Sequence, residues 1–427
     1  MSVSYERIEI SNGIYFNSLQ NAPLKTNSMT IHLTAPLQSE TAAKTAVLPF
    51  YLSDTNNTYR TEKALALKLQ QLYGANLGDG TLKLGDSQNI QLAASCINNK
   101  YAFDNEDVTG ELGKILFDCL LNPYVVEEAF EEKIFGLKKR ELEDSILSEI
   151  NDKRPYAFKR AGKVIFEGEP AAISNQGELP DAQALNARDA YSHYLKKISE
   201  SAIEISFAGQ SEDDAKRVLE TIVKPAFSSL SRSYKEFTKF KKSPLKPEPK
   251  RVVEYLDIAQ SKMVMAFKHK TNEKIPSHVM SLLNAVIGAT PSSKLFMNVR
   301  EKLSLCYYCS STYNDFKGCL AIDSGVEGKN AARAEEEIIR QISLTKKGEI
   351  SSDEIDNAKR QIINSARTIN DSPSAMISWY FTKNFANEIE SPEERIIKIQ
   401  SVNKTDLVNA ANTLELDSVY LLTKEEK

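Results

Sequence analysis

The chain has 427 residues, with 54 Lys and Arg against 58 Asp and Glu and a formal net charge of −4. This length exceeds a single hydrophobic core and predicts two domains of roughly 200 residues each. The lack of a basic surplus argues against nucleic acid as a partner, because phosphate binding needs a concentrated cationic face. With 41% hydrophobic residues, 17 Gly and 15 Pro, the composition is that of a globular, helix-rich protein.

Targeting signals are not evident. The first residues, MSVSYERIEISNGIYF, contain no apolar region of a signal peptide, so we expect no secretion. The longest apolar stretches, such as AVLPFYL (46–52), fall far short of the ~20 residues that cross a bilayer, so we expect no membrane partner. Five cysteines without a signal peptide indicate reduced thiols and a cytoplasmic protein.

The first half begins with strands and amphipathic helices. The alternating stretch MTIHLTA (29–35) predicts a strand that carries His32. Thr61 is placed to cap a helix with Leu65, Leu69 and Leu72 on one face. IQLAASCI (90–97) predicts a second half-buried strand. The helix that follows it has one apolar face, made of Val108, Leu112, Ile115 and Cys119.

The first half ends on a recognisable order of elements. Asn122-Pro123 stops the helix, and a long helix from about Glu127 runs to the pair Asn151-Asp152. A helix from 187 then leads to a strand at 202–209.

A change of composition near residue 244 predicts a boundary between domains. The segment KKSPLKPEPKR contains three prolines that break helices and several lysines that favour solvent: Pro244, Pro247, Pro249, Lys241, Lys242, Lys246 and Lys250. We predict an N-terminal domain at 1–238, a linker at 239–251 and a C-terminal domain at 252–427.

The second half repeats the first at a displacement of about 225 positions. CLAIDSGV (319–326) predicts a strand, and the next helix carries Ile338, Ile339 and Ile342. Ser351 and Glu354 have capping-box spacing before a long helix that reaches Asn370-Asp371. A helix from 404 and a strand at 418–423 close this half.

The predicted fold class is therefore α+β, with two homologous domains produced by duplication. Each domain is expected to be a mostly antiparallel sheet with helices on one face, and the pair to form a clam-shell around a cleft. An extended peptide that adds to a sheet edge is a candidate ligand.

The segment NVREKLSLCYYC (298–309) ends in a C-x-x-C spacing, which invites a metal or redox role. A structural zinc site needs four soft ligands, and only Cys319 lies close in sequence to Cys306 and Cys309. Strand alternation predicts that these two thiols point to opposite sides of a strand. We therefore expect the cysteines to pack as small buried hydrophobes.

Catalytic signatures are absent from the sequence. The four histidines, His32, His193, His269 and His278, show no H-x-x-x-H, H-E-x-x-H or H-x-x-E-H spacing. The sequence also contains no G-x-S-x-G elbow, no G-x-x-x-x-G-K-[ST] loop and no G-x-G-x-x-G. We predict no catalytic residue and no metal ligand in this chain.

VREKLSLCYY (299–308) resembles the second-domain motif R-E-K-x-x-L-A-Y of the M16 peptidase family, the pitrilysin and mitochondrial-processing-peptidase type. TYRTEKALALKLQQLYGANL (58–77) is similar to the stretch after the zinc helix of that family. The order of elements resembles two-domain subunits of the short-chain subfamily over nearly the whole chain. In the family, the arginine and tyrosine of this motif hold the substrate carbonyl. The resemblance implies substrate-binding roles for Arg300 and Tyr307.

The sequence departs from active members at the zinc helix. Active members carry H-x-x-E-H just before the 58–77 stretch, where this chain has AVLPFYLS (46–53), without His or carboxylate. We also expect Pro49 to interrupt a regular helix unless it falls in the first turn. The family's third ligand is a glutamate on the long downstream helix, for which Glu141 is the candidate. One carboxylate without imidazoles does not hold catalytic zinc.

The resemblance implies a pseudo-peptidase subunit that encloses and positions peptide or leader-peptide substrates. Its expected partner is a zinc-bearing M16 subunit in a heterodimer, so a zinc cofactor is expected only in that partner. A homodimer is an alternative when the chain is alone. A structural or binding scaffold of a larger complex is the alternative function, and an enzyme of unrelated chemistry is a third.

Overall fold

The computed structural model describes residues 3–21, 23–228, 230–271 and 274–425. Its internal contacts divide the chain into two compact units, each assembled from three segments. The segments of the first unit are Met1–Leu147, Ile173–Lys239 and Thr368–Ser391. The segments of the second unit are Ser148–Ala172, Phe240–Arg367 and Pro392–Lys427. The predicted domain boundaries stay a prediction. They divide the sequence into consecutive stretches, whereas the two units group segments that pack together.

The described part of the first unit contains a six-stranded sheet in the order β1-β2-β8-β3-β5-β4. Every neighbouring pair is antiparallel except β2 and β8. Its strands are β1 (Ser4–Ser11), β2 (Ile14–Gln20), β3 (Thr26–Pro36), β4 (Asn76–Leu84), β5 (Ser87–Ile97) and β8 (Ala202–Gly209). Its helices include α1 (Ser39–Leu52), α2 (Glu62–Gln71), α3 (Val108–Leu121), α4 (Glu132–Ser148), α6 (Leu179–Gln183), α7 (Ala187–Glu200), α8 (Glu212–Val218) and α13 (Pro373–Ala386).

The second unit contains a sheet in the order β11-β12-β10-β13-β9, in which β13 and β9 are parallel and the other pairs antiparallel. Its strands are β9 (Lys250–Tyr255), β10 (Ser261–His269), β11 (Cys306–Asn314), β12 (Cys319–Val326) and β13 (Leu414–Thr423). Its helices include α5 (Lys153–Ile165), α10 (Ser277–Asn284), the π-helix η7 (Leu295–Lys302), α11 (Ala331–Lys346), α12 (Ser352–Arg367), α14 (Pro392–Ser401) and α15 (Lys404–Thr413).

The two sheets share one topology. The strands β2-β8-β3-β5-β4 correspond in order and direction to β9-β13-β10-β12-β11. The predicted α+β class, with two related and mostly antiparallel sheets, is confirmed. In the described residues, no helix combines the length and the apolar character needed to cross a bilayer.

Each sheet of this repeat has one apolar face. On β3, Met29, Ile31 and Leu33 join the core that also contains residues of α1, α3 and α7. The alternate side chains of this strand, including Thr30 and His32, point to the opposite face, as the period of a strand requires. The structure therefore agrees with the strand predicted at 29–35.

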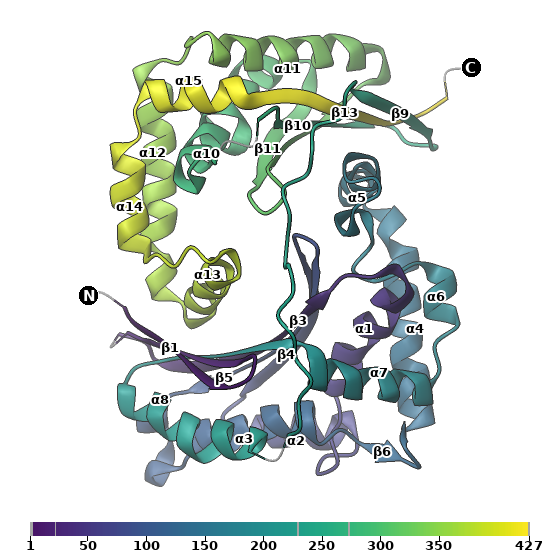
Figure 1. Cartoon of the computed structure of the whole chain (residues 1–427), viewed down its shortest axis with the longest axis vertical. Helices are drawn as coiled ribbons and strands as arrows, with labels where there is room; N and C mark the ends of the chain where they lie inside the picture. The colour runs from purple at the N-terminus through teal and green to yellow at the C-terminus, as the bar shows by residue number, and fades with distance from the viewer. Residues whose placement is uncertain (1–2, 22, 229, 272–273, 426–427) are drawn as a thin grey trace. The chain divides into compact units, whose positions relative to one another are not determined.

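The second face of each sheet is covered by a helix from the other half of the sequence. Met376, Ile377 and Tyr380 of α13 pack on Leu19 and Ala208 of the first sheet. Figure 1 shows α13 on the opposite side of this sheet from α3 and α8. The predicted arrangement places helices on only one face of each sheet, so it does not include this exchanged helix, which comes from the other half of the sequence.

The second sheet receives its helix in the same way. Ala157, Ala161 and Ile165 of α5 pack on Val264 of β10 and Leu422 of β13. The Asn-Asp pairs noted in the sequence lie directly before the exchanged helices. Asn151 ends the short helix Glu149–Asn151 and Asp152 is the N-cap of α5, and Asn370-Asp371 lies in Ile369–Asp371. The repeated pair therefore marks the points where the chain crosses from one unit to the other.

Helix boundaries follow the predicted caps in two places and differ in others. The Thr61 side chain accepts a hydrogen bond from the amide of Ala64, and Ser351 with Glu354 forms the reciprocal pair of a capping box. The helix predicted from about Glu127 begins only at Glu132, because Glu127 and Glu128 have positive φ angles.

Two predictions about apolar residues also need correction. The helix α1 continues through Pro49, since the side chains on both sides of the proline are buried in the core and offset the lost hydrogen bond. Ile339 is 38% exposed, whereas Ile338 and Ile342 are buried on the predicted face of α11.

The linker predicted at 239–251 has an extended conformation before β9 begins. Its backbone is held by a hydrogen bond from the Ser243 amide to the Lys317 carbonyl oxygen. The ammonium of Lys246 pairs with the fully buried Asp417 at 3.0 Å, so this lysine is tied to the second unit and is not a solvated side chain.

His32 is a buried titratable group under α13. Its ring stacks on Phe381 with 3.7 Å between ring centroids, and no described residue bonds to its buried Nδ1. Burial lowers the pKa of His32 from 6.5 to about 3. Between these two values only the unfolded chain takes up the proton, so stability is full above the unfolded pKa and falls as the pH drops.

We expect His32 to make the protein acid-sensitive before its carboxylates titrate. Between about pH 8 and about pH 5, this residue alone should lower the free energy of unfolding by about 2 kcal/mol, and His32→Asn should remove that part of the loss. Urea unfolding at both pH values measures the free energy of unfolding of each protein. Thr30→Ser, on the same face of β3, is the control and should keep the parent's full loss. An identical pH dependence in His32→Asn and the parent would contradict the assignment.

Candidate functional site

The predicted substrate-binding residues lie at a helix-to-strand corner of the second unit. The π-helix η7 is anchored by the fully buried Leu295 and Val299, and three residues separate its end from the start of β11. In the connection, Ser304 adopts a left-handed conformation, and the amide of Leu305 bonds back to the Val299 carbonyl oxygen. The chain therefore makes a tight helix-to-strand corner at this point.

A cavity of about 430 Å³ opens at this corner. Arg300 and Tyr307 both line it, so the structure brings the two predicted residues together. Tyr307 is 62% exposed. The guanidinium of Arg300 lies 4.5 Å from the ring centroid of Phe296, and its Nε is 3.6 Å from Glu301.

The chemistry of this wall suits a polar, extended ligand. Arg300 offers a planar set of N–H donors that match carbonyl or carboxylate oxygens, and its packing on Phe296 limits the orientations of the fork. Tyr307 adds an exposed aromatic ring with a hydroxyl at its end.

The prediction that Cys306 and Cys309 point to opposite sides is wrong. In β11, Cys306 pairs with Val326 and Tyr308 with Gly325, so Tyr307 is an extra residue in a β-bulge. The bulge shifts the alternation by one position and turns both thiols to the buried side. The expectation that the cysteines are buried is confirmed for all five.

The two thiols of the bulge interact directly. The hydrogen bond with Cys309 lowers the pKa of Cys306, and a hydrogen bond with Ser324 and the charge of Arg300 act in the same direction. That hydrogen bond and burial raise the pKa of Cys309. Cys306 also lines the cavity of Arg300 and Tyr307, so its thiol is an internal reporter on this site.

The stretch where the family's zinc motif would lie is core structure here. In 46–53, Val47, Leu48 and Leu52 are buried among apolar side chains. Tyr51 donates its hydroxyl hydrogen to the Tyr124 carbonyl oxygen and accepts from the Glu131 amide. Across the described residues, no three His, Cys, Asp or Glu side chains come together as a metal site.

Glu141, the candidate third ligand, is paired with a lysine. The nearly buried ammonium of Lys138 contacts Glu141 at 3.1 Å and also pairs with Asp54. Burial opposes charging of Lys138, but the hydrogen bonds with Asp54 and Glu141 outweigh it and raise the lysine pKa. The two carboxylates are therefore neutralised by a cation that the chain itself supplies.

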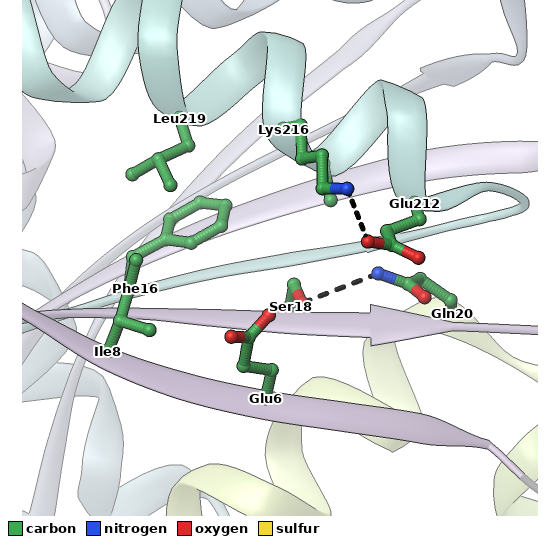
Figure 2. A pocket seen from close by; sticks show the side chains of 9 residues that line it. Glu6, Ile8, Phe16, Ser18, Gln20, Glu212, Lys216 and Leu219 are labelled. Atoms are coloured by element: carbon green, nitrogen blue, oxygen red, sulfur yellow. Dashed lines mark hydrogen bonds and ion pairs between the residues drawn. The ribbon is translucent and has the colours of Figure 1, made fainter.

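Two further features of the first unit escaped the sequence analysis. Figure 2 shows a small pocket between β1, β2 and α8, where Lys216 pairs with Glu212. Its volume of about 30 Å³ is suited to a water molecule and not to a substrate.

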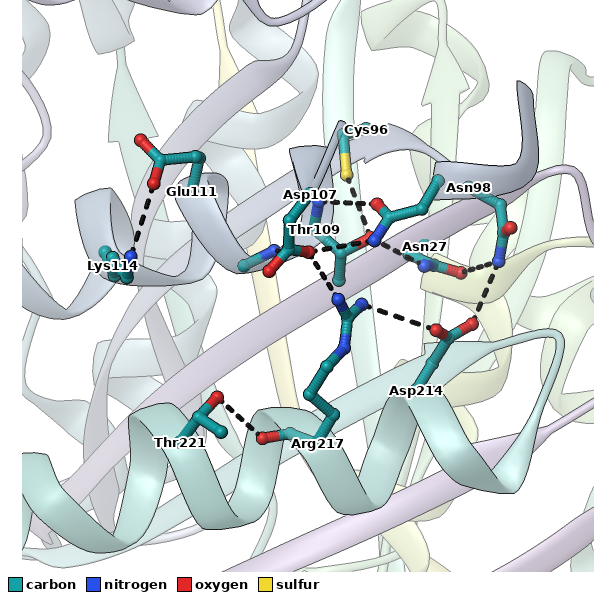
Figure 3. A network of polar contacts seen from close by, with 12 residues as sticks. Asn27, Cys96, Asn98, Asp107, Thr109, Glu111, Lys114, Asp214, Arg217 and Thr221 are labelled. Carbon is teal, nitrogen blue, oxygen red and sulfur yellow. Dashed lines mark hydrogen bonds and ion pairs between the residues drawn. The ribbon is translucent and has the colours of Figure 1, made fainter. Parts of the chain in front are cut away.

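The second feature is a polar network that joins sheet and helices (Figure 3). Arg217 of α8 bridges Asp107, the N-cap of α3, and Asp214. Asn98 connects Asp214 to Asn27 of β3. These groups satisfy one another, which indicates a structural role. Their residues are far apart in sequence, so no local signal predicts the network.

The family model described as "Peptidase M16 inactive domain" matches residues 184–362. The "Probable inactive metalloprotease YmfF" of Bacillus subtilis (strain 168) is 27% identical over 418 residues, covering 97% of this chain and 96% of the relative.

Solved structures show the same fold. A conserved protein from Enterococcus faecalis V583 superimposes with a TM-score of 0.89 at 24% identity, covering 99% of both chains. A peptidase M16 inactive domain from Pseudomonas fluorescens gives a TM-score of 0.81 at 15% identity, covering 100% of this chain and 98% of the other. Over residues 184–362 the chain is therefore similar to the M16 inactive domain, over nearly its whole length it shares the fold of these proteins, and its sequence has no H-x-x-E-H motif.

Proposed function

We propose that this chain is the non-catalytic subunit of an M16-type zinc peptidase heterodimer. It encloses and positions peptide or leader-peptide substrates in the cytoplasm, and a zinc-bearing partner subunit cleaves them. The observation that carries the proposal is that Arg300 and Tyr307 line one cavity while the positions of the zinc motif hold core residues.

The cavity wall supports peptide positioning. A peptide presents a row of carbonyl oxygens, and the Arg300 guanidinium is a charged donor of the kind that binds such acceptors strongly. The exposed ring of Tyr307 provides an apolar surface beside it. Holding an extended peptide in one orientation removes much of its freedom before the attack, which is a contribution that a subunit without metal can make.

The first unit supports the division of labour. Lys138 occupies the space between Asp54 and Glu141 with a positive charge, and 46–53 supplies no imidazole. In the proposed pair, the partner's zinc activates the water. The name of the Bacillus subtilis relative, a probable inactive metalloprotease, is consistent with the same assignment.

Co-expression with zinc-bearing M16 chains tests the partnership. We expect a complex with one zinc per pair that cleaves peptides, and much slower cleavage by the partner alone. Metal analysis and a peptide-cleavage assay on the isolated complex measure both quantities. Cleavage by the partner alone at the rate of the pair would favour a structural scaffold instead.

Arg300→Ala tests the role of the cavity in that complex. We expect the KM for peptides to rise about tenfold, because a hydrogen bond from a charged donor contributes about 1.5–3 kcal/mol, with the zinc content unchanged. The matched control is Arg333→Ala, which removes an exposed arginine on α11 and should leave the KM as in the parent. Equal KM values for the Arg300 variant and the parent would rule out a substrate contact.

Cys306 gives a second measurement that needs no catalysis. Its pKa is lowered, and it lines the same cavity, so it should be alkylated before the other four cysteines. A peptide substrate bound to the complex should slow this alkylation several-fold, which mass spectrometry of the modified peptide can follow. Arg300→Ala should weaken the protection. Undiminished alkylation at saturating peptide would place the peptide elsewhere.

A further inference from the structure

A second cavity of about 430 Å³ lies in the first unit, away from the residues discussed so far. Its walls come from three segments: the start of α1, the second half of α7, and the extended chain near Lys235. That extended chain is fixed to the end of α7, since the Ser233 amide bonds to the Ser199 carbonyl oxygen and Arg232 bonds to Ser201. The cavity is thus a built part of the unit.

Lys197 is the unusual side chain of this cavity. It is only 9% exposed, and its ammonium makes no hydrogen bond or ion pair with any described residue. Burial lowers the pKa of Lys197 to about 8; Lys196 lowers it further, and Glu200 raises it. A largely buried ammonium without a partner is unfavourable, so its position in a cavity wall points to an anionic ligand.

The start of α1 adds a positive helix end to the wall. The N-cap residue Gln38 makes no side-chain cap, and both Gln38 and Thr41 line the cavity. The positive end of this 14-residue helix therefore borders the cavity, where the Thr41 amide bonds to the Gln38 carbonyl oxygen and the Glu40 amide bonds to its own carboxylate. Glu40, the acidic residue of the first turn, is exposed and is not part of the wall.

Two hydroxyl groups complete the set. Ser201 is fully buried, and its Oγ has no hydrogen-bond partner among the described residues. The buried Oγ1 of Thr41 has none there either. Both residues line the cavity, and each hydroxyl can donate to a ligand oxygen.

The charge of the wall selects a dianion over a monoanion. Lys196 and Lys235 line the cavity with Lys197, and Glu200 is the acidic residue among the lining side chains. His193 bonds to Thr45, and burial lowers its pKa to about 3, so it is neutral at physiological pH. Three lysines against one glutamate leave two positive charges.

We propose that this cavity binds the phosphate group of a small phosphate monoester or free inorganic phosphate, held by Lys197, the start of α1 and the hydroxyls of Thr41 and Ser201. The three terminal oxygens of such a group match this number of donors better than the two oxygens of a carboxylate. The site is independent of the proposed peptide-positioning role, because it uses none of the residues around Arg300.

Titration calorimetry at low ionic strength and about pH 7 tests the site, with inorganic phosphate, phenyl phosphate and benzoate as probes. We expect binding of one phosphate group per chain, and no saturable binding of benzoate. Equal affinity for both phosphates would assign free phosphate as the ligand, and tighter binding of phenyl phosphate would assign a monoester. Binding should weaken as the pH rises through about 8, since Lys197 loses its proton.

Variants separate the site from general charge effects. Lys197→Gln should weaken phosphate binding at least tenfold, and Ser201→Ala and Lys235→Gln several-fold. Lys235 is exposed, so its variant keeps the test valid if Lys197→Gln does not fold. Lys63→Gln, an exposed lysine on α2, is the control and should bind as the parent does. Absence of saturable phosphate binding, benzoate binding of equal strength, or unchanged binding in both Lys197→Gln and Lys235→Gln would overturn the proposal.

Discussion

The carboxylate of Glu204 lies beneath α13 with Arg7 and Asn17 as its partners, and this contact determines what can cover the polar face of the first sheet. Asn17 in turn accepts from Tyr5 and from Asn384 of α13. Glu204 has its partners on β1 and β2, and the covering helix adds a polar group, Asn384, that matches the buried Asn17. The helix that does so comes from the far half of the sequence.

The second unit applies the same constraint with different residues. Asp323 of β12 is 7% exposed and pairs with Arg154 at the start of α5, and the Arg154 guanidinium also lies over the ring of Tyr308. Each duplicated half therefore completes the sheet of the other. Neither half can change its exchanged helix without exposing the polar face of its counterpart. A chain without the H-x-x-E-H motif therefore still has a structural reason to keep the whole fold.

The sequence predicts whatever depends on local pattern. The caps at Thr61 and Ser351 and the alternation of β3 follow from spacing within a few residues. The bulge at Tyr307 could not be predicted, since it is defined by the register against β12 and not by β11 alone. The same holds for Pro49, whose helix survives because of burial in the core, and for Lys197, whose cavity needs three distant segments. The exchange of α5 and α13 likewise depends on which polar groups meet after folding.

The absence of the H-x-x-E-H motif is accompanied by a charge arrangement that opposes a metal site. Substituting histidines into 46–53 would supply imidazoles, but Asp54 and Glu141 already hold the ammonium of Lys138. A metal that recruited Glu141 would leave this nearly buried lysine with Asp54 alone, and a metal that recruited both carboxylates would leave its charge uncompensated. Removal of Lys138 together with the new ligands would avoid that cost. The new ligands and the removal of Lys138 are separate substitutions, and neither alone creates a metal site. The ion pair of Lys138 with Asp54 and Glu141 therefore stabilises the metal-free form.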